Sequence, residues 1–352
     1  MSTPKTYNFG IIGAGVIGDF HAKAIAHIPN ANLAYLYGRD FNKTSHLAEK
    51  YGCQARQDYT QMFEDESIDI VTIATPSGLH SQPVLEAAKA GKHVICEKPL
   101  DISLQRIDAM IAAHEKAGTY LGCIFQNRFT EAMVPLKKAI KQGRFGTITF
   151  AGVFVPWWRK EEYYANSWHG TWDLDGGGAL MNQSIHMIDM LCDLLGPVES
   201  VQAYCAMLGH NDMETEDTAV ASLRFQNKAL GLLYGSTASY PGQLKRFELT
   251  GTNGTVIYVD DSIALWQFAD ARPEDQFILE NYGRRQSFSG GAADPSDISF
   301  KYHQANIEAF IDAIDTNQPF ELDGQEGRKA VELVLAIYES AKNNELVKLR
   351  SG

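Results

Sequence analysis

The stretch YNFGIIGAGVIG, residues 7–18, decides the fold of the first part of this chain. Its first half is an apolar run that predicts a short buried strand, and its second half has G-x-G-x-x-G spacing and leads into a helical stretch. In such a turn the first glycine allows the tight bend, the second lets the backbone approach a pyrophosphate, and the third lets helix and strand pack closely. The start of the helix adds free N–H groups for an anion. The residues predicted to hold a dinucleotide here are Gly13, Gly15, Val16, Ile17 and Gly18.

The residues after the second predicted strand, Leu33 to Tyr37, indicate which dinucleotide binds. An NAD site normally has an acidic residue here for the adenosine ribose, but this sequence has Gly38-Arg39-Asp40. Gly38 leaves room for a 2′-phosphate and Arg39 supplies a guanidinium to pair with it. In the alternative, Arg39 stacks over the adenine and Asp40 binds the ribose. We therefore expect NADP or NAD, with NADP favoured, and assign Gly38 and Arg39 to the cofactor site.

Strands and helices alternate regularly through the first third of the chain. This succession predicts an α/β fold with a doubly wound parallel sheet, whose ligands bind at the carboxyl ends of the strands. We expect a dinucleotide-binding domain at 1–124 and a second domain at 125–352. The predicted strands are 7–12, 33–37, 68–74, 93–97 and 120–125. One predicted helix follows the glycine turn and ends at residue 28, and two more span 81–90 and 103–117.

Composition excludes several classes of protein. The 352 residues include 31 basic and 43 acidic side chains, a net charge of −12, which argues against extended nucleic-acid binding. Five widely spaced cysteines indicate buried free thiols in a reducing compartment. Without a secretory signal or an apolar run of about 20 residues, we expect a cytoplasmic protein that does not contact a membrane. The sequence also has no metal-binding motif, so we expect no metal.

Several motifs together resemble the Gfo/Idh/MocA oxidoreductases. The resemblance implies a Rossmann domain followed by an α/β domain with a large open, mostly antiparallel sheet, which commonly forms homodimers or homotetramers. The motifs are the glycine turn, Thr75-Pro76 with His80, Glu97-Lys98-Pro99, Gly176-Gly177-Gly178 with His186 and Asp189, residues 251–255 and residues 323–329.

The same resemblance assigns roles to individual residues. It implies that Lys98 is the catalytic lysine beside the nicotinamide and that Glu97 lies near the nicotinamide ribose. Elementary chemistry supports the role of Lys98, because a lysine at the carboxyl end of a parallel strand would favour an alkoxide forming from a substrate hydroxyl. The other cofactor-binding residues implied are Thr75, Pro76, His80 and Gln126.

A helix predicted from Ala179 to Leu195 has one polar stripe. Periodicity alone would make this stripe a solvent face, but the three glycines before it favour a ligand site. Family members usually have an aspartate where this chain has Asn182, and an amide cannot take up a proton. We therefore assign proton transfer to His186, whose unperturbed pKa of about 6.5 suits neutral pH, and hydroxyl positioning to Asn182. The stripe consists of Asn182, His186, Asp189 and Asp193.

An aromatic segment at 157–173 suits the apolar face and hydroxyl edges of a sugar ring. The alternative is a packing surface or a subunit contact. Within the family, this segment is similar to enzymes that oxidise sugar rings, including UDP-sugar dehydrogenases. The substrate-binding residues expected are Lys98, Arg159, Tyr163, His169, Trp172, Asn182 and His186.

These residues predict an NAD(P)-dependent dehydrogenase or reductase that acts on a secondary hydroxyl of a sugar, sugar acid, cyclitol or nucleotide sugar. Lys98, His186 and Asn182 form the expected catalytic set. Two other functions stay open: a redox-neutral NAD-dependent glycosidase, and a non-catalytic sugar or dinucleotide sensor.

Overall fold

A computed structural model describes residues 5–283 and 299–349. The chain divides into two compact units, and the first of them contains the described residues up to Gln126 together with Ser299–Val331. The second contains Asn127 to Gly283 and Glu332 to Leu349 of the described chain. In this part of the chain, no helix is both long and apolar enough to cross a membrane.

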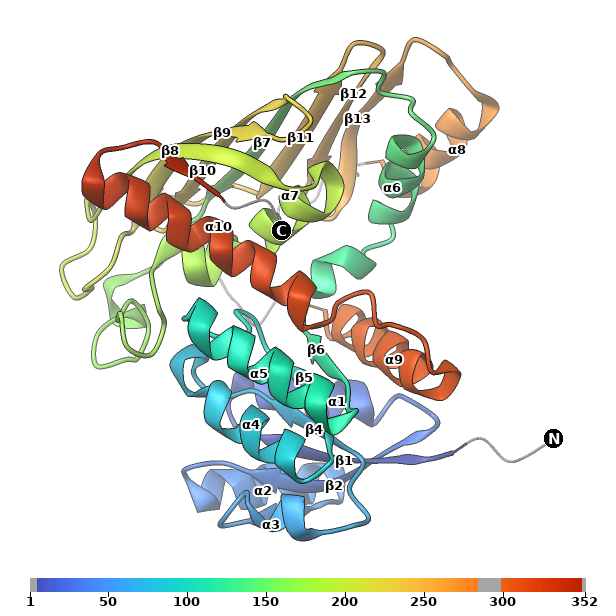
Figure 1. The fold of residues 1–352 in the computed structure, drawn as a ribbon, viewed down its shortest axis with the longest axis vertical. Coiled ribbons are helices and arrows are strands. Elements are labelled where there is room, and N and C mark those ends of the chain that lie inside the picture. Colours follow the sequence, from blue (N-terminus) through green and yellow to red (C-terminus); the bar gives the residue numbers. More distant parts are fainter. Residues whose placement is uncertain (1–4, 284–298, 350–352) are drawn as a thin grey trace. The chain divides into compact units, whose positions relative to one another are not determined.

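The first unit contains a six-stranded parallel sheet in the order β3-β2-β1-β4-β5-β6 (Figure 1). Because the order reverses between β1 and β4, the crossovers on the two sides run in opposite directions and place their helices on opposite faces. The predicted doubly wound sheet is confirmed. The strands are β1 (Tyr7–Ile12), β2 (Ala31–Tyr37), β3 (Gln54–Arg56), β4 (Ile70–Ile73), β5 (His93–Cys96) and β6 (Leu121–Cys123), and the helices are α1 (Val16–Ile25), α2 (Phe41–Tyr51), α3 (Gln61–Glu64), α4 (Ser81–Lys89), α5 (Leu104–Ala117) and α9 (Lys301–Thr316).

A late segment of the chain returns to this first unit. The Tyr7 hydroxyl donates to Asp315 at 2.7 Å, and the Asn306 side chain accepts the Phe125 N–H at 3.0 Å. Helix α9 also packs beside α1. The expected boundary at residue 124 assigned all later residues to the second domain, whereas the structure gives Ser299–Val331 to the first unit. These contacts join residues more than 180 positions apart, which local sequence patterns do not report.

The second unit contains an eight-stranded sheet in the order β13-β12-β11-β7-β10-β9-β8-β14. Within this second sheet, as far as the structure describes it, β10 and β7 are the one parallel pair and the other neighbours are antiparallel, so the predicted open, mostly antiparallel sheet is confirmed. Its strands are β7 (Ile148–Pro156), β8 (Val198–Ala206), β9 (Thr218–Phe225), β10 (Leu230–Ser236), β11 (Arg246–Gly251), β12 (Gly254–Val259), β13 (Ser262–Phe268) and β14 (Val347–Lys348), and its helices are α6 (Met133–Lys141), α7 (Ile185–Leu195), α8 (Pro273–Tyr282) and the later part of α10 (Gly324–Asn343).

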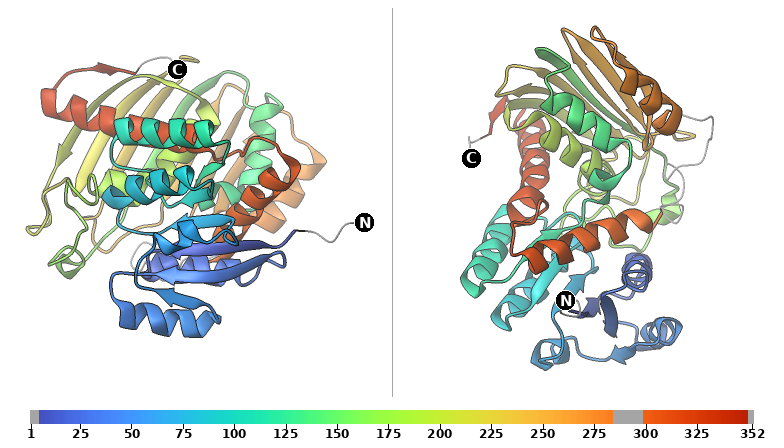
Figure 2. Two further views of the ribbon diagram at one scale, coloured as in Figure 1. Left: turned by 60° about the horizontal axis from the view of Figure 1, so that its bottom comes forward. Right: turned by 90° about the vertical axis from the view of Figure 1, so that its right-hand side faces the viewer.

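One face of this second sheet is buried and the other is exposed. Along β9 and β10, buried and exposed side chains alternate, as the two-residue period of a strand requires. The buried face packs on α7, which lies under the sheet in both views of Figure 2. The exposed face carries apolar side chains on three neighbouring strands, with 65% of Tyr204, 54% of Leu230, 40% of Val220 and 38% of Leu232 exposed.

All five cysteines are free thiols, as predicted. Cys96 and Cys123 are buried on the neighbouring strands β5 and β6, whereas Cys53, Cys192 and Cys205 are only half-buried. Burial raises the pKa of the Cys205 thiol to about 12, so this group stays protonated at neutral pH.

Candidate functional site

The glycine turn after β1 has one glycine for packing at each end and an open position between them. Gly13 has a φ of 122°, and a side chain there would overlap the Ala74 carbonyl. A side chain at Gly18 would overlap the Gly13 carbonyl. At Gly15, in contrast, a Cβ would meet no protein atom within 4 Å. The residues therefore fit a dinucleotide, because the middle glycine leaves space beside the free N–H groups at the start of α1.

The three residues after β2, Gly38, Arg39 and Asp40, have different environments. A Cβ at Gly38 would lie 2.5 Å from both the Ala14 Cβ and the Thr44 hydroxyl, so an acidic side chain does not fit there. Asp40 caps α2 by accepting the Lys43 N–H at 3.1 Å. Arg39 is exposed, and its guanidinium makes no ion pair with any other residue that the structure describes. A positive charge thus stands where the adenosine end of the cofactor is expected.

His80 ties together the loops after β4 and β5. Its side chain is buried, with Nδ1 2.9 Å from the Pro99 carbonyl and Nε2 2.9 Å from the Thr75 carbonyl. Carbonyl oxygens only accept, so a neutral ring donates its one N–H to one of these two loops and contacts the other. The ring fixes these loops relative to each other within the first unit.

Glu97 is the centre of a buried cluster that includes two histidines not predicted from the sequence. The His21 Nε2 lies 2.9 Å from the Glu97 Oε1, and the His303 Nε2 lies 3.5 Å from the same oxygen. The other oxygen, Oε2, accepts the Lys98 N–H at 3.1 Å. Burial raises the pKa of Glu97, but the hydrogen bonds from the two imidazoles outweigh it and hold this pKa well below its usual range. The carboxylate therefore stays ionised and fixes the backbone of Lys98.

The same three side chains are also the group that could hold a metal ion in the described part of the chain, since their donor atoms lie within 4.8 Å of one another. The 2.9 Å separation from His21 is that of an N–H donor and a carboxylate acceptor. Burial lowers the pKa of His303, which favours a neutral ring that donates one proton. We interpret the cluster as a hydrogen-bonded one.

In the second unit, the predicted helix from Ala179 begins as a π-helix. The segment η4 (Ala179–Ser184) is wound as π-helix, and α7 follows from Ile185. A buried carboxylate, Glu216, holds its start by accepting the N–H groups of Gly178 at 3.1 Å and Leu180 at 2.9 Å. The Tyr338 hydroxyl donates to the same carboxylate at 2.9 Å. π-Helical turns often occur at functional sites, and this one carries Asn182.

The expected polar stripe has two different parts. Asp189 is buried and pairs with Arg128 at 2.6 Å, and Asp193 binds the same guanidinium at 3.0 Å. These two carboxylates hold α7 to the segment before α6 and do not form a solvent face. Asn182 and His186 are half-buried, and the Asn182 Nδ2 donates to Asp175 at 2.7 Å. Sequence reasoning missed Asp175, Arg128 and Glu216, because nothing local distinguishes them from surface charges.

Stability should depend on pH through Glu216. Burial raises the pKa of Glu216 to about 7 from an ordinary 4.5, so between these pH values the folded state keeps a proton that the unfolded chain has lost. Stability therefore falls as pH rises through this window, by about 3 kcal/mol in total. We expect Glu216→Gln to remove this component when urea unfolding is compared at pH 5 and pH 8. The control is Glu214→Gln, a substitution at an exposed neighbour. If the free energy of unfolding changed equally between pH 5 and pH 8 in the wild type and in Glu216→Gln, the prediction would be contradicted.

Three of the predicted substrate residues lie together. The buried Arg159 guanidinium lies 5.7 Å from the centre of the Tyr163 ring, and the His169 ring lies 4.2 Å from that ring. Burial raises the pKa of the Tyr163 phenol, and the charge of Asp175 adds to this shift. This group therefore places a guanidinium and aromatic faces near the Asp175 carboxylate.

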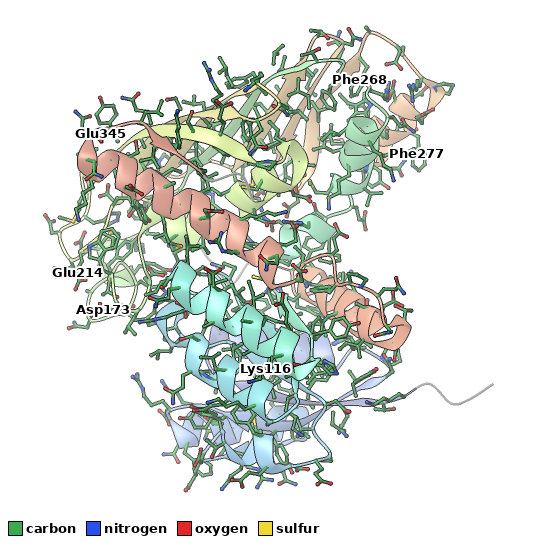
Figure 3. The ribbon with its side chains drawn as sticks, viewed as in Figure 1. Lys116, Asp173, Glu214, Phe268, Phe277 and Glu345 are labelled. Carbon is green, nitrogen blue, oxygen red and sulfur yellow. The ribbon has the colours of Figure 1, made fainter. Side chains whose placement is uncertain are left out.

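Trp172 is in a different environment. Its side chain is 47% exposed, and its backbone and ring N–H groups donate to the side chain and carbonyl of Glu214. Figure 3 labels the neighbouring Asp173 together with Glu214 in this loop region of the second unit. The ring also packs edge-on against Tyr338, 5.5 Å between centres.

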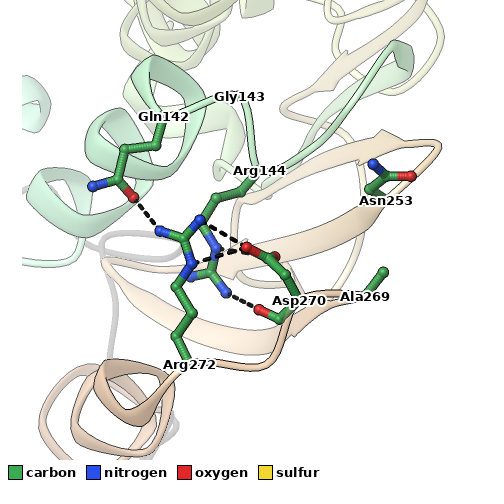
Figure 4. Close-up of a pocket in the computed structure, with 7 residues that line it drawn as sticks. All are labelled: Gln142, Gly143, Arg144, Asn253, Ala269, Asp270 and Arg272. Atoms are coloured by element: carbon green, nitrogen blue, oxygen red, sulfur yellow. Dashed lines mark hydrogen bonds and ion pairs between the residues drawn. The ribbon is translucent and has the colours of Figure 1, made fainter.

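A separate hollow of 390 Å³ contains none of the predicted site residues (Figure 4). Its two guanidinium groups are already neutralised, since Arg144 pairs with Asp275 at 2.6 Å and Arg272 pairs with Asp270 at 2.7 Å. It offers no unpaired charge to a ligand. The hollow is lined by Gln142, Gly143, Arg144, Asn253, Ala269, Asp270 and Arg272.

A parallel sheet in the order 3-2-1-4-5-6 with a glycine turn at its reversal point defines a dinucleotide-binding Rossmann domain. Comparison with known proteins agrees. Residues 7–125 match the oxidoreductase family with an NAD-binding Rossmann fold, and residues 133–257 match the Gfo/Idh/MocA C-terminal domain. The chain belongs to the Gfo/Idh/MocA family, and it is a nicotinamide-dependent oxidoreductase that acts on CH–OH groups.

Similar proteins act on cyclic polyols and sugars. The myo-inositol 2-dehydrogenase of Thermotoga maritima is 29% identical over 354 aligned residues, 97% of this chain and 98% of that protein. The levoglucosan dehydrogenase of Pseudarthrobacter phenanthrenivorans is 27% identical over 72% of this chain and 74% of its own. The WlbA dehydrogenase of Bordetella pertussis, solved with NADH and UDP-GlcNAcA, is 33% identical, with a TM-score of 0.87 over 99% of this chain and 100% of that one.

Proposed function

We propose that this enzyme oxidises a secondary hydroxyl of a sugar, or reduces the corresponding ketone, with Lys98, His186 and Asn182 as its catalytic residues. Oxidation removes a proton from the hydroxyl oxygen and a hydride from its carbon, which leaves a ketone. The bound nicotinamide dinucleotide supplies the hydride acceptor. His186 takes the proton, while the Lys98 ammonium stabilises negative charge on the oxygen and Asn182 accepts a hydrogen bond from a neighbouring hydroxyl of the sugar, which positions the ring.

The fixed backbone of Lys98 is the observation that carries this proposal. Its N–H is held by a buried, ionised Glu97, and its loop is tied through His80 to the loop after β4. A lysine anchored in this way at the carboxyl end of β5 lies at the edge of the sheet where ligands bind in such folds. A surface lysine needs no such support.

For the substrate, we propose a nucleotide sugar or a sugar acid. The WlbA dehydrogenase was solved with UDP-GlcNAcA and is 33% identical to this chain along almost its whole length. A buried Arg159 against an aromatic ring also suits a substrate that carries an anionic group, because a guanidinium binds carboxylate or phosphate with two parallel hydrogen bonds. Inositol and free sugars, the substrates named for other relatives, are the alternatives.

The test is the absorbance of reduced nicotinamide during incubation with NAD⁺ or NADP⁺. The panel contains UDP-sugars and UDP-sugar acids, free sugars, sugar acids and inositols. A rise with UDP-sugar acids supports the whole proposal, and a rise with inositols alone would overturn the substrate class. No rise with any compound, while the purified protein still carries its dinucleotide, would overturn dehydrogenation and favour the redox-neutral glycosidase or the sensor.

Arg39 should decide between the two dinucleotides, and we propose that it pairs with the 2′-phosphate of NADP(H). Arg39→Ala should weaken NADPH binding by about tenfold to a hundredfold and change NADH binding less than threefold, because a charge-assisted pair with phosphate contributes roughly 1.5–3 kcal/mol. Fluorescence titration of both reduced cofactors measures this difference. Equal losses would show that Arg39 stacks on the adenine, and Lys43→Ala, an exposed cation in the next turn of chain, is the control.

We also propose that the exposed face of the second sheet joins two or more copies of the chain into a homodimer or homotetramer. Exposed apolar side chains lie on three neighbouring strands of this face, and exposed apolar patches mark protein contacts. Four of them, Tyr204, Val220, Leu230 and Leu232, are between 38% and 65% exposed.

A further inference from the structure

Asp175 is a buried carboxylate directly before the three glycines that lead into η4. Only 1% of its surface is exposed. Its Oδ1 accepts the Asn182 Nδ2–H at 2.7 Å, and its Oδ2 accepts the Gly170 N–H at 2.9 Å. Both oxygens of one carboxylate therefore hold two segments of the second unit, of which one carries a predicted catalytic residue.

This contact determines which way the Asn182 amide faces. An ionised carboxylate only accepts hydrogen bonds, so the amide atom that faces it is the nitrogen. The amide oxygen of Asn182 then lies on the other side of the side chain. Without the carboxylate, either atom of the amide could take the outward position, and an outward NH₂ could not accept a hydrogen bond from a substrate hydroxyl.

We propose that Asp175 is a positioning residue, which holds Asn182 so that its amide oxygen accepts a hydrogen bond from the substrate hydroxyl next to the reacting one, whose own proton goes to His186. This inference rests on the proposed function and extends it. Asp175 itself takes no part in proton transfer, because both of its oxygens are already used by protein donors.

The first test is Asp175→Asn. An asparagine at this position offers one acceptor oxygen to two donors, so either Gly170 or Asn182 loses its partner. We expect kcat to fall about tenfold to a hundredfold, since a displacement of about 1 Å at a reacting group costs up to that factor. KM and NADH binding should change less than threefold. Asp173→Asn is the matched control, because it is the same substitution on an exposed neighbour and should leave kcat unchanged.

Exchanging the two residues gives the sharper test. In Asn182→Asp, two carboxylates stand at hydrogen-bond distance and cannot both stay ionised, so the pair must share a proton. Activity relative to the wild type should therefore rise as pH falls. In the double variant Asp175→Asn with Asn182→Asp, one amide again donates to one carboxylate, and we expect kcat to recover at least tenfold over either single variant.

Other charged groups around the pair do not produce this pH dependence. The phenols of Tyr163 and Tyr164 sense the Asp175 charge, but burial raises the pKa of both well above the assay range. The Arg159 guanidinium, which acts on the same phenols, stays charged throughout. His186 is present in every variant, and the double variant has the same aspartate at position 182, so the pH dependence of the carboxylate pair is taken as the difference between Asn182→Asp and the double variant.

The outcomes separate this inference from the proposed function. A wild-type enzyme that oxidises no compound of the panel overturns the proposed function and the inference with it. An active wild type with an unchanged Asp175→Asn variant overturns the inference alone. If Asp175→Asn unfolds, the double variant decides: recovery of both the unfolding midpoint and kcat supports positioning, whereas recovery of the midpoint without kcat shows a purely structural contact.

Discussion

Lys98→Met should lower kcat by at least a hundredfold, and by about a thousandfold if the ammonium acts alone on the developing oxyanion. Methionine keeps the length and apolar stem of lysine, so the loop after β5 retains its packing. The anchor of that loop is unaffected, because Glu97 holds the backbone N–H of residue 98 and not its side chain. We therefore expect NADH to bind with an unchanged Kd.

The measurement pairs initial rates with fluorescence titration of the reduced cofactor. Lys89→Met, a substitution at an exposed lysine at the end of α4, is the matched control and should be neutral. A Lys98→Met variant with more than a tenth of wild-type turnover would show that another group stabilises the oxygen. A large loss of cofactor affinity would instead assign Lys98 to binding.

His186→Ala should reduce kcat by about a hundredfold to ten-thousandfold, the range for loss of a general base. His186 lies half-buried in the first turn of α7, one turn after Asn182. Asn182 is an amide, and its carboxylate partner Asp175 is buried with each oxygen bound to a protein N–H, so neither is expected to replace the imidazole as proton acceptor. The loss should therefore be larger than that for Asp175→Asn.

Added imidazole distinguishes proton transfer from mere positioning. If His186 moves the proton, millimolar imidazole should restore part of the activity of His186→Ala, and the restored rate should follow the concentration of neutral imidazole. His186→Asn, which can hydrogen-bond but not take up a proton, should stay as slow as the alanine variant without rescue. Full activity of either variant would refute the assignment. His27→Ala, at an exposed histidine, is the control.

Local patterns in the sequence predicted five of the six strands of the first sheet and its glycine turn, but not the three-residue edge strand β3. The roles of Gly13, Gly15 and Gly18 follow from spacing alone, and each matches what a Cβ would meet at that position. The absence of an acid after β2 was read as space for a phosphate, and the structure adds a second reason, the close contact of Gly38 with Ala14. Short-range spacing works here because the turn, the strand and the helix are consecutive in the chain.

For the helix after the three glycines, periodicity did not predict the local winding or the partners of the polar side chains. The expected stripe was one face of a regular helix, but η4 is wound as π-helix, so residues 182 and 186 do not follow the ordinary period. Two of the four stripe residues bind Arg128, more than 60 positions earlier in the chain. Spacing along a helix identifies a common face, but it does not identify what lies opposite that face.

The sequence by itself determined the parallel sheet, the position of the dinucleotide turn, the family and the residues that the resemblance implies for catalysis. Only the tertiary structure decided which charges support them. Glu97 is held by His21 and by His303, which lies 206 positions later in the chain. Glu216, just before β9, fixes the start of η4. Buried carboxylates need several donors, and the chain supplies these from distant segments that meet only after folding. A sequence pattern records neighbours along the chain, whereas burial and ion pairing depend on neighbours in space.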